Sequence, residues 1–258
     1  MDTLQLPAST SVKIIAHRGA SDRAPENTLA AVRLAGKIGA SGVEVDVRLT
    51  RDGRLAVLHD ADTRRVAPTQ YRRRVSRCTL DELQTVEVGS WKNPGYAGEK
   101  IPALDEVLAA LGPTQEIFIE VKSREIAGVL AELDKHLAPP TPKGFPAVRA
   151  VVMSFNGHLV RTIKARRPEW RVLLLLNRKP FARTVARIRA EVRAGRLDGI
   201  GQNRRWLLAA RDYASLREIG AILSVWTVDD PMEAKAWRER GFDYLTSNVP
   251  ERMQRKDE

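Results

Sequence analysis

The chain has 258 residues, of which 43% are hydrophobic, enough to form a full buried core. The single cysteine, Cys78, excludes an internal disulfide framework, and the longest apolar run, residues 172–176, is far shorter than the roughly 20 residues of a membrane helix. Lysine and arginine outnumber aspartate and glutamate by 43 to 32, and the net charge of +11 favours anionic partners such as phosphate esters, nucleic acid or an acidic membrane surface.

Short apolar runs alternate with segments of helical periodicity along the whole chain. Asp230-Pro231 is typical of a helix start, and Gly220 and Gly241 are typical of helix ends. This alternation predicts an α/β fold, a TIM (β/α)₈ barrel formed as a single domain over residues 1–258, with a doubly wound open sheet as the alternative. The runs that predict the barrel strands are residues 12–16, 43–49, 116–122, 150–155, 171–176, 198–202, 222–228 and 243–247.

Residues 54–100 are too long for a simple connection between a strand and a helix. They predict a small insertion after strand 2, over about residues 60–100, that follows a short strand in the segment RLAVLHD. It could attract anionic substrates or make a weak contact with an anionic membrane surface, and a solvated loop without a partner is the alternative. Residues 64–77 supply its charge, with no acidic residue and six arginines: Arg64, Arg65, Arg72, Arg73, Arg74 and Arg77.

Three acidic side chains fall on neighbouring predicted strands. Side chains alternate along VEVDVRL, residues 43–49, so Glu44 and Asp46 point to one face and three valines to the other. Carboxylates about 7 Å apart inside a barrel repel each other unless a cation lies between them. Glu120 would add a third carboxylate from the next barrel strand, and such oxygen ligands favour Mg²⁺ or Ca²⁺. The alternatives are a solvated strand face and a salt bridge between Glu120 and Lys122.

Two of the four histidines, His17 and His59, follow predicted strands at the same end of the barrel. Two imidazoles that flank a phosphorus centre can divide the work of phosphodiester cleavage, one removing a proton and the other supplying one. Arg18 and Lys122, with a divalent cation, would neutralise charge on the phosphoryl oxygens. The alternative, when each histidine is considered alone, is that it has a structural or surface role.

Four segments, in this order and at this spacing, closely resemble the glycerophosphodiester phosphodiesterase family: AHRGASDRAPENTLAA, GVEVDVRLTRDGRLAVLHD, IEVK and VWTVDD. The resemblance runs from about residue 13 to about residue 250. It implies a TIM barrel with a small insertion after strand 2, which agrees with the strand count. It also implies hydrolysis of deacylated phospholipids to sn-glycerol 3-phosphate and an alcohol. The N-terminal residues, MDTLQLPASTSVK, have no basic patch followed by an apolar core, so we expect no signal peptide and a soluble, cytoplasmic protein.

The resemblance implies that one divalent cation, Mg²⁺ or Ca²⁺, is the cofactor. The acid–base pair would then be His17 and His59, and by analogy with related phosphodiesterase barrels we assign His17 as the base and His59 as the acid. The other implied roles are metal ligands for Glu44, Asp46 and Glu120, and phosphate contacts for Arg18 and Lys122.

The remaining motifs carry weaker expectations. Phe155 and Trp226 are predicted to form apolar walls for the glycerol moiety, with ordinary barrel core as the alternative. In PENT, Glu26 and Asn27 are predicted to start a helix, with a direct role in the site as the alternative. The segment YLTSNVP departs from the aspartate that often follows the threonine in the family, and no catalytic role is expected there.

Two rival functions use the same residues differently. A phospholipase D-like or cyclising lyase that acts on lysophospholipids would share the histidines and the acidic groups. A catalytically inactive barrel could instead bind nucleic acid through its basic surface, but the chain lacks the aromatic residues interleaved with basic ones that single strands require. We therefore expect a small-molecule glycerophosphodiester and no nucleic acid as partner; the head group and the oligomeric state are left open.

Overall fold

The computed structural model describes residues 12–70, 72–137, 149–178 and 182–254. Within these residues, eight parallel strands close into a barrel, because β1 pairs with β2 on one side and with β9 on the other. The (β/α)₈ prediction is confirmed, and this closure excludes the open sheet. The barrel strands are β1 (Lys13–His17), β2 (Gly42–Leu49), β4 (Glu116–Val121), β5 (Ala150–Ser154), β6 (Arg171–Leu176), β7 (Gly199–Asn203), β8 (Ile222–Trp226) and β9 (Tyr244–Ser247).

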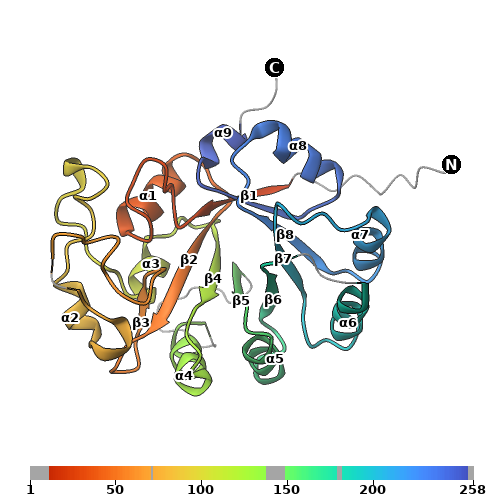
Figure 1. Cartoon of the computed structure of the whole chain (residues 1–258), viewed down its shortest axis with the longest axis horizontal. Helices are drawn as coiled ribbons and strands as arrows, with labels where there is room; N and C mark the ends of the chain where they lie inside the picture. The colour runs from red at the N-terminus through yellow and green to blue at the C-terminus, as the bar shows by residue number, and fades with distance from the viewer. Residues whose placement is uncertain (1–11, 71, 138–148, 179–181, 255–258) are drawn as a thin grey trace.

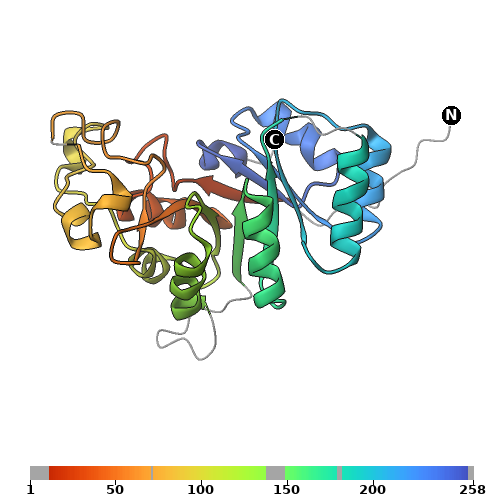
Figure 2. The same cartoon turned by 60° about the horizontal axis from the view of Figure 1, so that its bottom comes forward.

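Helices surround the barrel, as Figures 1 and 2 show. The predicted punctuation is confirmed at α8, where the Asp230 side chain caps the helix and Pro231 is its first residue. Gly220 and Gly241 have the positive φ angles that suit helix ends. No helix within the described ranges is long and apolar enough to cross a membrane. The helices between barrel strands are α1 (Leu29–Lys37), α3 (Leu104–Ala110), α4 (Ile126–Leu137), α5 (Gly157–Arg166), α6 (Ala182–Arg193), α7 (Ala210–Arg217) and α8 (Pro231–Glu239), followed by α9 (Pro250–Gln254).

Two apolar layers hold the barrel together. Val43, Val45 and Val47 point outward from β2 and pack beneath the helices, as their alternation predicts. Inside the barrel, the ring of Phe118 packs edge to face on Tyr244, with 4.8 Å between ring centroids. This apolar interior layer separates the polar inward-facing side chains at the C-terminal ends of the strands from an ionic group at the N-terminal ends, where Glu116 pairs with Lys13 and Arg171.

The predicted insertion follows β2 and lies at one side of the barrel in Figure 1. The short strand β3 (Leu55–Val57) precedes it and pairs antiparallel with β2. The insertion itself contains two 3₁₀ turns, η1 (Val75–Arg77) and η2 (Pro94–Tyr96), and the short helix α2 (Leu80–Gln84). A separate apolar cluster supports it, including Val66, Leu83 and Ile101. Because the insertion has a core of its own, its surface can hold side chains against the strand ends.

Gly199 is a point where the barrel tolerates no side chain. A Cβ atom there would lie 2.0 Å from the carbonyl oxygen of Ile222 on the neighbouring strand β8. We expect Gly199→Ala to lower the free energy of unfolding by about 2–3 kcal/mol, because the strands must separate. Gly112→Ala is the control, since a Cβ there lies 3.4 Å from Gln115, an ordinary contact. Equal losses in urea denaturation of the two variants would contradict the prediction.

Candidate active site

A cavity of about 270 Å³ opens at the C-terminal ends of the barrel strands. Strand register brings its acidic groups together, because Asp46 of β2 lies opposite Glu120 of β4, and Glu44 lies opposite His17 of β1. Five of the lining residues are apolar or hydroxyl-bearing residues of β5, β6, β8 and β9. The predicted site residues that line the cavity are His17, Arg18, Glu44, His59, Glu120, Lys122, Phe155 and Trp226.

The three predicted metal ligands are buried together. Glu44, Asp46 and Glu120 each offer a carboxylate oxygen, and these oxygens lie within 4.8 Å of one another. Oε1 of Glu44 is buried without a hydrogen-bond partner. Burial, followed by the charges of Asp46 and Glu120, raises the pKa of Glu44 well above its usual range. A buried all-oxygen set with an unpartnered acceptor fits a hard divalent cation.

Two positively charged side chains, Lys122 and Arg18, lie against this carboxylate cluster. Nζ of Lys122 is 3.1 Å from Asp46 Oδ1 and 2.5 Å from Glu120 Oε1. The Arg18 backbone NH donates to Glu44 at 3.0 Å, and Arg18 Nε lies 3.1 Å from Asp46 Oδ2. Arg18 has a φ of +56° and Gly19 one of +81°, so the chain turns sharply at the end of β1. This turn directs both the NH and the guanidinium of Arg18 into the acidic cluster.

His17 is held by a neutral amide. The Nδ2 group of Asn248 donates to Asp229 at 2.7 Å, which leaves Asn248 Oδ1 facing His17 Nδ1, also at 2.7 Å. His17 therefore donates from Nδ1 and presents the lone pair of Nε2, which lies 3.8 Å from Glu44. Burial, with a contribution from Arg18, lowers the pKa of His17 to about 4. The imidazole is neutral and can accept a proton at Nε2.

His59 is held by a carboxylate instead. Its Nδ1 donates to Asp60 Oδ1 at 2.7 Å, which leaves Nε2 available at the cavity. Burial lowers the pKa of His59, while the negative charge of Asp46 opposes the shift. Burial raises the pKa of Asp60, but its hydrogen bonds from His59 and Arg65 outweigh this and lower it. An ionised Asp60 stabilises the imidazolium form of His59.

The prediction that Glu26 and Asn27 start a helix is wrong. Thr28 caps α1, accepting a hydrogen bond from Ala31, and the helix begins at Leu29. Asn27, with a φ of +59°, instead exchanges two hydrogen bonds with Asp46, its Nδ2 donating at 2.9 Å and its Oδ1 accepting from the Asp46 NH at 3.2 Å. Asn27 thereby positions a proposed metal ligand.

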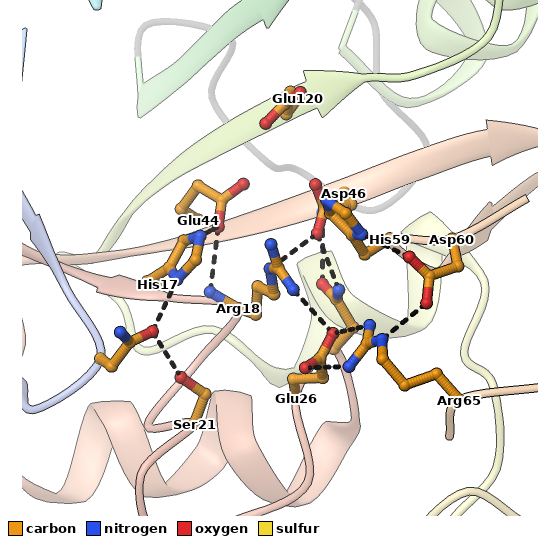
Figure 3. Close-up of polar contacts among 12 residues, drawn as sticks. His17, Arg18, Ser21, Glu26, Glu44, Asp46, His59, Asp60, Arg65 and Glu120 are labelled. Carbon is orange, nitrogen blue, oxygen red and sulfur yellow. Dashed lines mark hydrogen bonds and ion pairs between the residues drawn. The ribbon is translucent and has the colours of Figure 1, made fainter. Parts of the chain in front are cut away.

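Glu26 also lies in the site. Its carboxylate accepts hydrogen bonds from Arg18 and Arg65, as Figure 3 shows. The contacts of Glu26 and Asn27 agree with the alternative expectation of a direct site role for them, whereas the sequence reasoning missed the contacts of Asn248 and Arg65. The motif PENT was the available signal for the first two, because such polar residues have no evident use in a helix start that Thr28 already caps.

The two predicted aromatic walls meet at the cavity. Phe155 packs edge to face on Trp226, with 5.7 Å between ring centroids, and Lys122 Nζ lies 5.9 Å from the centre of the Phe155 ring. The Phe155 residue is 39% exposed, so it is not barrel core. The pair forms an apolar part of the cavity wall, with Lys122 beside it.

The arginine cluster of residues 64–77 is divided in its contacts. Arg65 is bound to Glu26 and Asp60, and Arg72 to Asp62. Arg64, Arg74 and Arg77 are exposed. The cluster is therefore partly a structural element of the site and partly a basic surface.

Comparison with known proteins identifies relatives over nearly the whole chain. The model of the glycerophosphoryl diester phosphodiesterase family matches residues 17–252. A glycerophosphodiester phosphodiesterase of Caldanaerobacter subterraneus is 35% identical over 63% of this chain and 65% of its own length. One from Bacillus subtilis is 27% identical over 92% of this chain and 83% of its own. The structure of an Oleispira antarctica phosphodiesterase in complex with its product sn-glycerol-3-phosphate has a TM-score of 0.82 and 27% identity, covering 94% of this chain and 95% of that one.

The carboxylate cluster predicts cation-dependent stability. We expect millimolar Mg²⁺ or Ca²⁺ to raise the melting temperature of the protein, because a ligand that binds only the folded state stabilises it. Glu120→Gln should remove this increase, and without cation it should melt no lower than wild type because repulsion in the cluster falls. Glu116→Gln is the matched control at the other end of β4, where the carboxylate pairs with Lys13 and Arg171. An equal cation-induced increase in melting temperature in both variants would contradict the assignment of Glu120 as a metal ligand.

Proposed function

The chain belongs to the glycerophosphoryl diester phosphodiesterase family, and on that premise we propose that it hydrolyses glycerophosphodiesters to sn-glycerol 3-phosphate and an alcohol. Water supplies a hydroxyl group to phosphorus and a proton to the departing alkoxide, so the bond to the alcohol oxygen breaks and the reaction balances. The observation that carries the proposal is the placement of two imidazoles on one cavity beside three buried carboxylates.

Substrate binding rests on the charged side of the cavity. Glu44, Asp46 and Glu120 would hold one divalent cation, Mg²⁺ or Ca²⁺, which when bound supplies positive charge to the phosphoryl oxygens. Arg18 and Lys122 line the cavity and contact phosphate oxygens in the same region. The apolar pair of Phe155 and Trp226 covers the carbon chain of the glycerol moiety.

Proton transfer is divided between the histidines. Neutral His17, fixed in one tautomer by Asn248, accepts a proton at Nε2 from the attacking water. His59, whose imidazolium form Asp60 stabilises, gives its Nε2 proton to the leaving alkoxide. Burial lowers the pKa of His59, and the negative charge of Asp46 and the hydrogen bond to Asp60 oppose this shift in favour of the imidazolium.

The arginine-rich part of the insertion gives the proposed site a basic approach. Arg64, Arg74 and Arg77 are exposed on the insertion and add positive charge that attracts anionic diesters from solution. The same residues could bring the enzyme weakly to an anionic lipid surface. The barrel and the insertion act as one functional unit in this proposal.

The direct test is product analysis with purified protein. We expect turnover of a panel of glycerophosphodiesters, including glycerophosphocholine, with glycerol 3-phosphate and the free alcohol as products. A chelator should abolish turnover, and Mg²⁺ or Ca²⁺ should restore it. Lysophosphatidylcholine is included in the panel, and turnover of it in place of glycerophosphocholine would identify a lysophospholipid-cleaving enzyme instead.

Substitution of either histidine tests the proton roles. We expect His17→Gln and His59→Gln to lower kcat by about 10²-fold or more, the range of general acid–base catalysis. His158→Gln is the control, because His158 is exposed on α5 and does not line the cavity. Retention of wild-type kcat by His17→Gln would sink the mechanism.

Asn248 tests the orientation of His17. We expect Asn248→Ala to lower kcat by about tenfold or more, because the imidazole loses the acceptor that fixes its tautomer. Ser21→Ala is the matched control, since it removes only a second hydrogen bond to the same Asn248 oxygen, at 3.2 Å. Steady-state kinetics with similar losses in both variants would show that the amide does not orient the ring.

A further inference from the structure

Arg65 of the insertion has no role in the reaction proposed above, yet it contacts two residues that hold site groups. We propose that Arg65 is a positioning residue that fixes the orientations of His59 and Arg18 at once, acting through Asp60 and Glu26 (Figure 3). This inference rests on the proposed function, because it assumes that His59 is the proton donor to the leaving alcohol.

The contact with Asp60 fixes the partner of His59. Asp60 uses one oxygen for each neighbour: Oδ1 accepts from His59 Nδ1 at 2.7 Å, and Oδ2 accepts from Arg65 Nε at 2.6 Å. The carboxylate cannot rotate without losing one of these bonds. The Asp60 side chain is 32% exposed, so without Arg65 it is free to turn toward solvent and release the imidazole. Arg65 therefore determines where the Nε2 proton of His59 points.

The contact with Glu26 extends the same control to Arg18. Arg65 binds Glu26 through two nitrogens, Nη1 to Oε2 at 2.8 Å and Nη2 to Oε1 at 2.7 Å. Oε1 of Glu26 also accepts from Arg18 Nη1 at 2.9 Å. Planar guanidinium groups are suited to this paired geometry, and a lysine ammonium is not. A continuous chain of hydrogen bonds thus links His59 to Arg18 through Asp60, Arg65 and Glu26.

The insertion provides a firm base for Arg65. The next residue, Val66, is buried in the apolar cluster of the insertion, and the Ala67 NH donates to the Thr63 carbonyl at 2.9 Å across the turn that carries Arg65. The insertion therefore does more than lengthen the chain after β2. It supplies the guanidinium group that holds Arg18, at the end of β1, and His59, just after β3, in one arrangement.

The dependence on the leaving group distinguishes positioning from general structural support. With glycerophosphocholine, whose choline alkoxide needs a proton to leave, we expect Arg65→Gln to lower kcat by about tenfold or more. With glycerol 3-(p-nitrophenyl phosphate), whose nitrophenolate leaves without a proton, kcat should fall less than about threefold. KM should rise for both substrates, because Arg18 is loosened. Arg65→Lys should recover only part of the loss.

The controls separate the outcomes. Arg72→Gln removes another arginine–aspartate pair of the insertion, between Arg72 and Asp62. It should leave kcat and KM unchanged for both substrates. His59→Gln serves as the reference for loss of the proton donor. One outcome is that His59→Gln lowers kcat selectively for glycerophosphocholine while Arg65→Gln lowers kcat equally for both substrates or for neither. In that case the positioning role is wrong and the proposed function stands. If His59→Gln itself lowers kcat equally for both substrates, the acid role of His59 is wrong, and the positioning proposal is wrong with it.

Discussion

Mutual repulsion among three buried carboxylates is the constraint on which the site depends. Glu44, Asp46 and Glu120 converge because parallel strands of a closed barrel end at the same face, and burial makes their charges costly. Arg18 and Lys122 lie against them and offset part of the charge. In the proposed function, a divalent cation would balance the carboxylates, and the phosphate of an anionic substrate would balance the arginine and the lysine.

Local backbone geometry is adapted to this cluster. Arg18 and Asn27 are both non-glycine residues with positive φ, and each directs a polar group onto a carboxylate of β2. Such conformations are uncommon, and they concentrate at functional sites where the surroundings hold them in place. Asp46 is the best-supported member, since Asn27, Arg18 and Lys122 all contact it, and these contacts lower its pKa against the effect of burial. Glu44 has fewer contacts, and its pKa is raised.

The sequence predicts the strands and the acidic cluster because both depend on local rules. Alternation along β2 sets which side chains face inward, and parallel register then aligns Asp46 with Glu120. The pairing of His17 with Asn248 joins residues 231 positions apart, and Arg65 meets Glu26 across 39 positions. No period or local motif encodes such contacts. The start of α1 was misplaced for a related reason: Thr28 is an equally good capping residue, and the preceding polar residues are used by the site.

The two histidines differ in what holds them, and this difference supports their proposed division of labour. His17 faces an amide whose orientation Asp229 fixes; a neutral acceptor gives little stabilisation to an imidazolium, and Arg18 nearby opposes it further. His59 faces a carboxylate, which stabilises the imidazolium. Burial lowers the pKa of both imidazoles, but of the two only His59 has a hydrogen-bonded carboxylate that opposes the shift, which favours it as the acid and His17 as the base. The amide comes from the end of β9 and the carboxylate from the start of the insertion, so the division depends on segments far apart in the sequence meeting over one cavity.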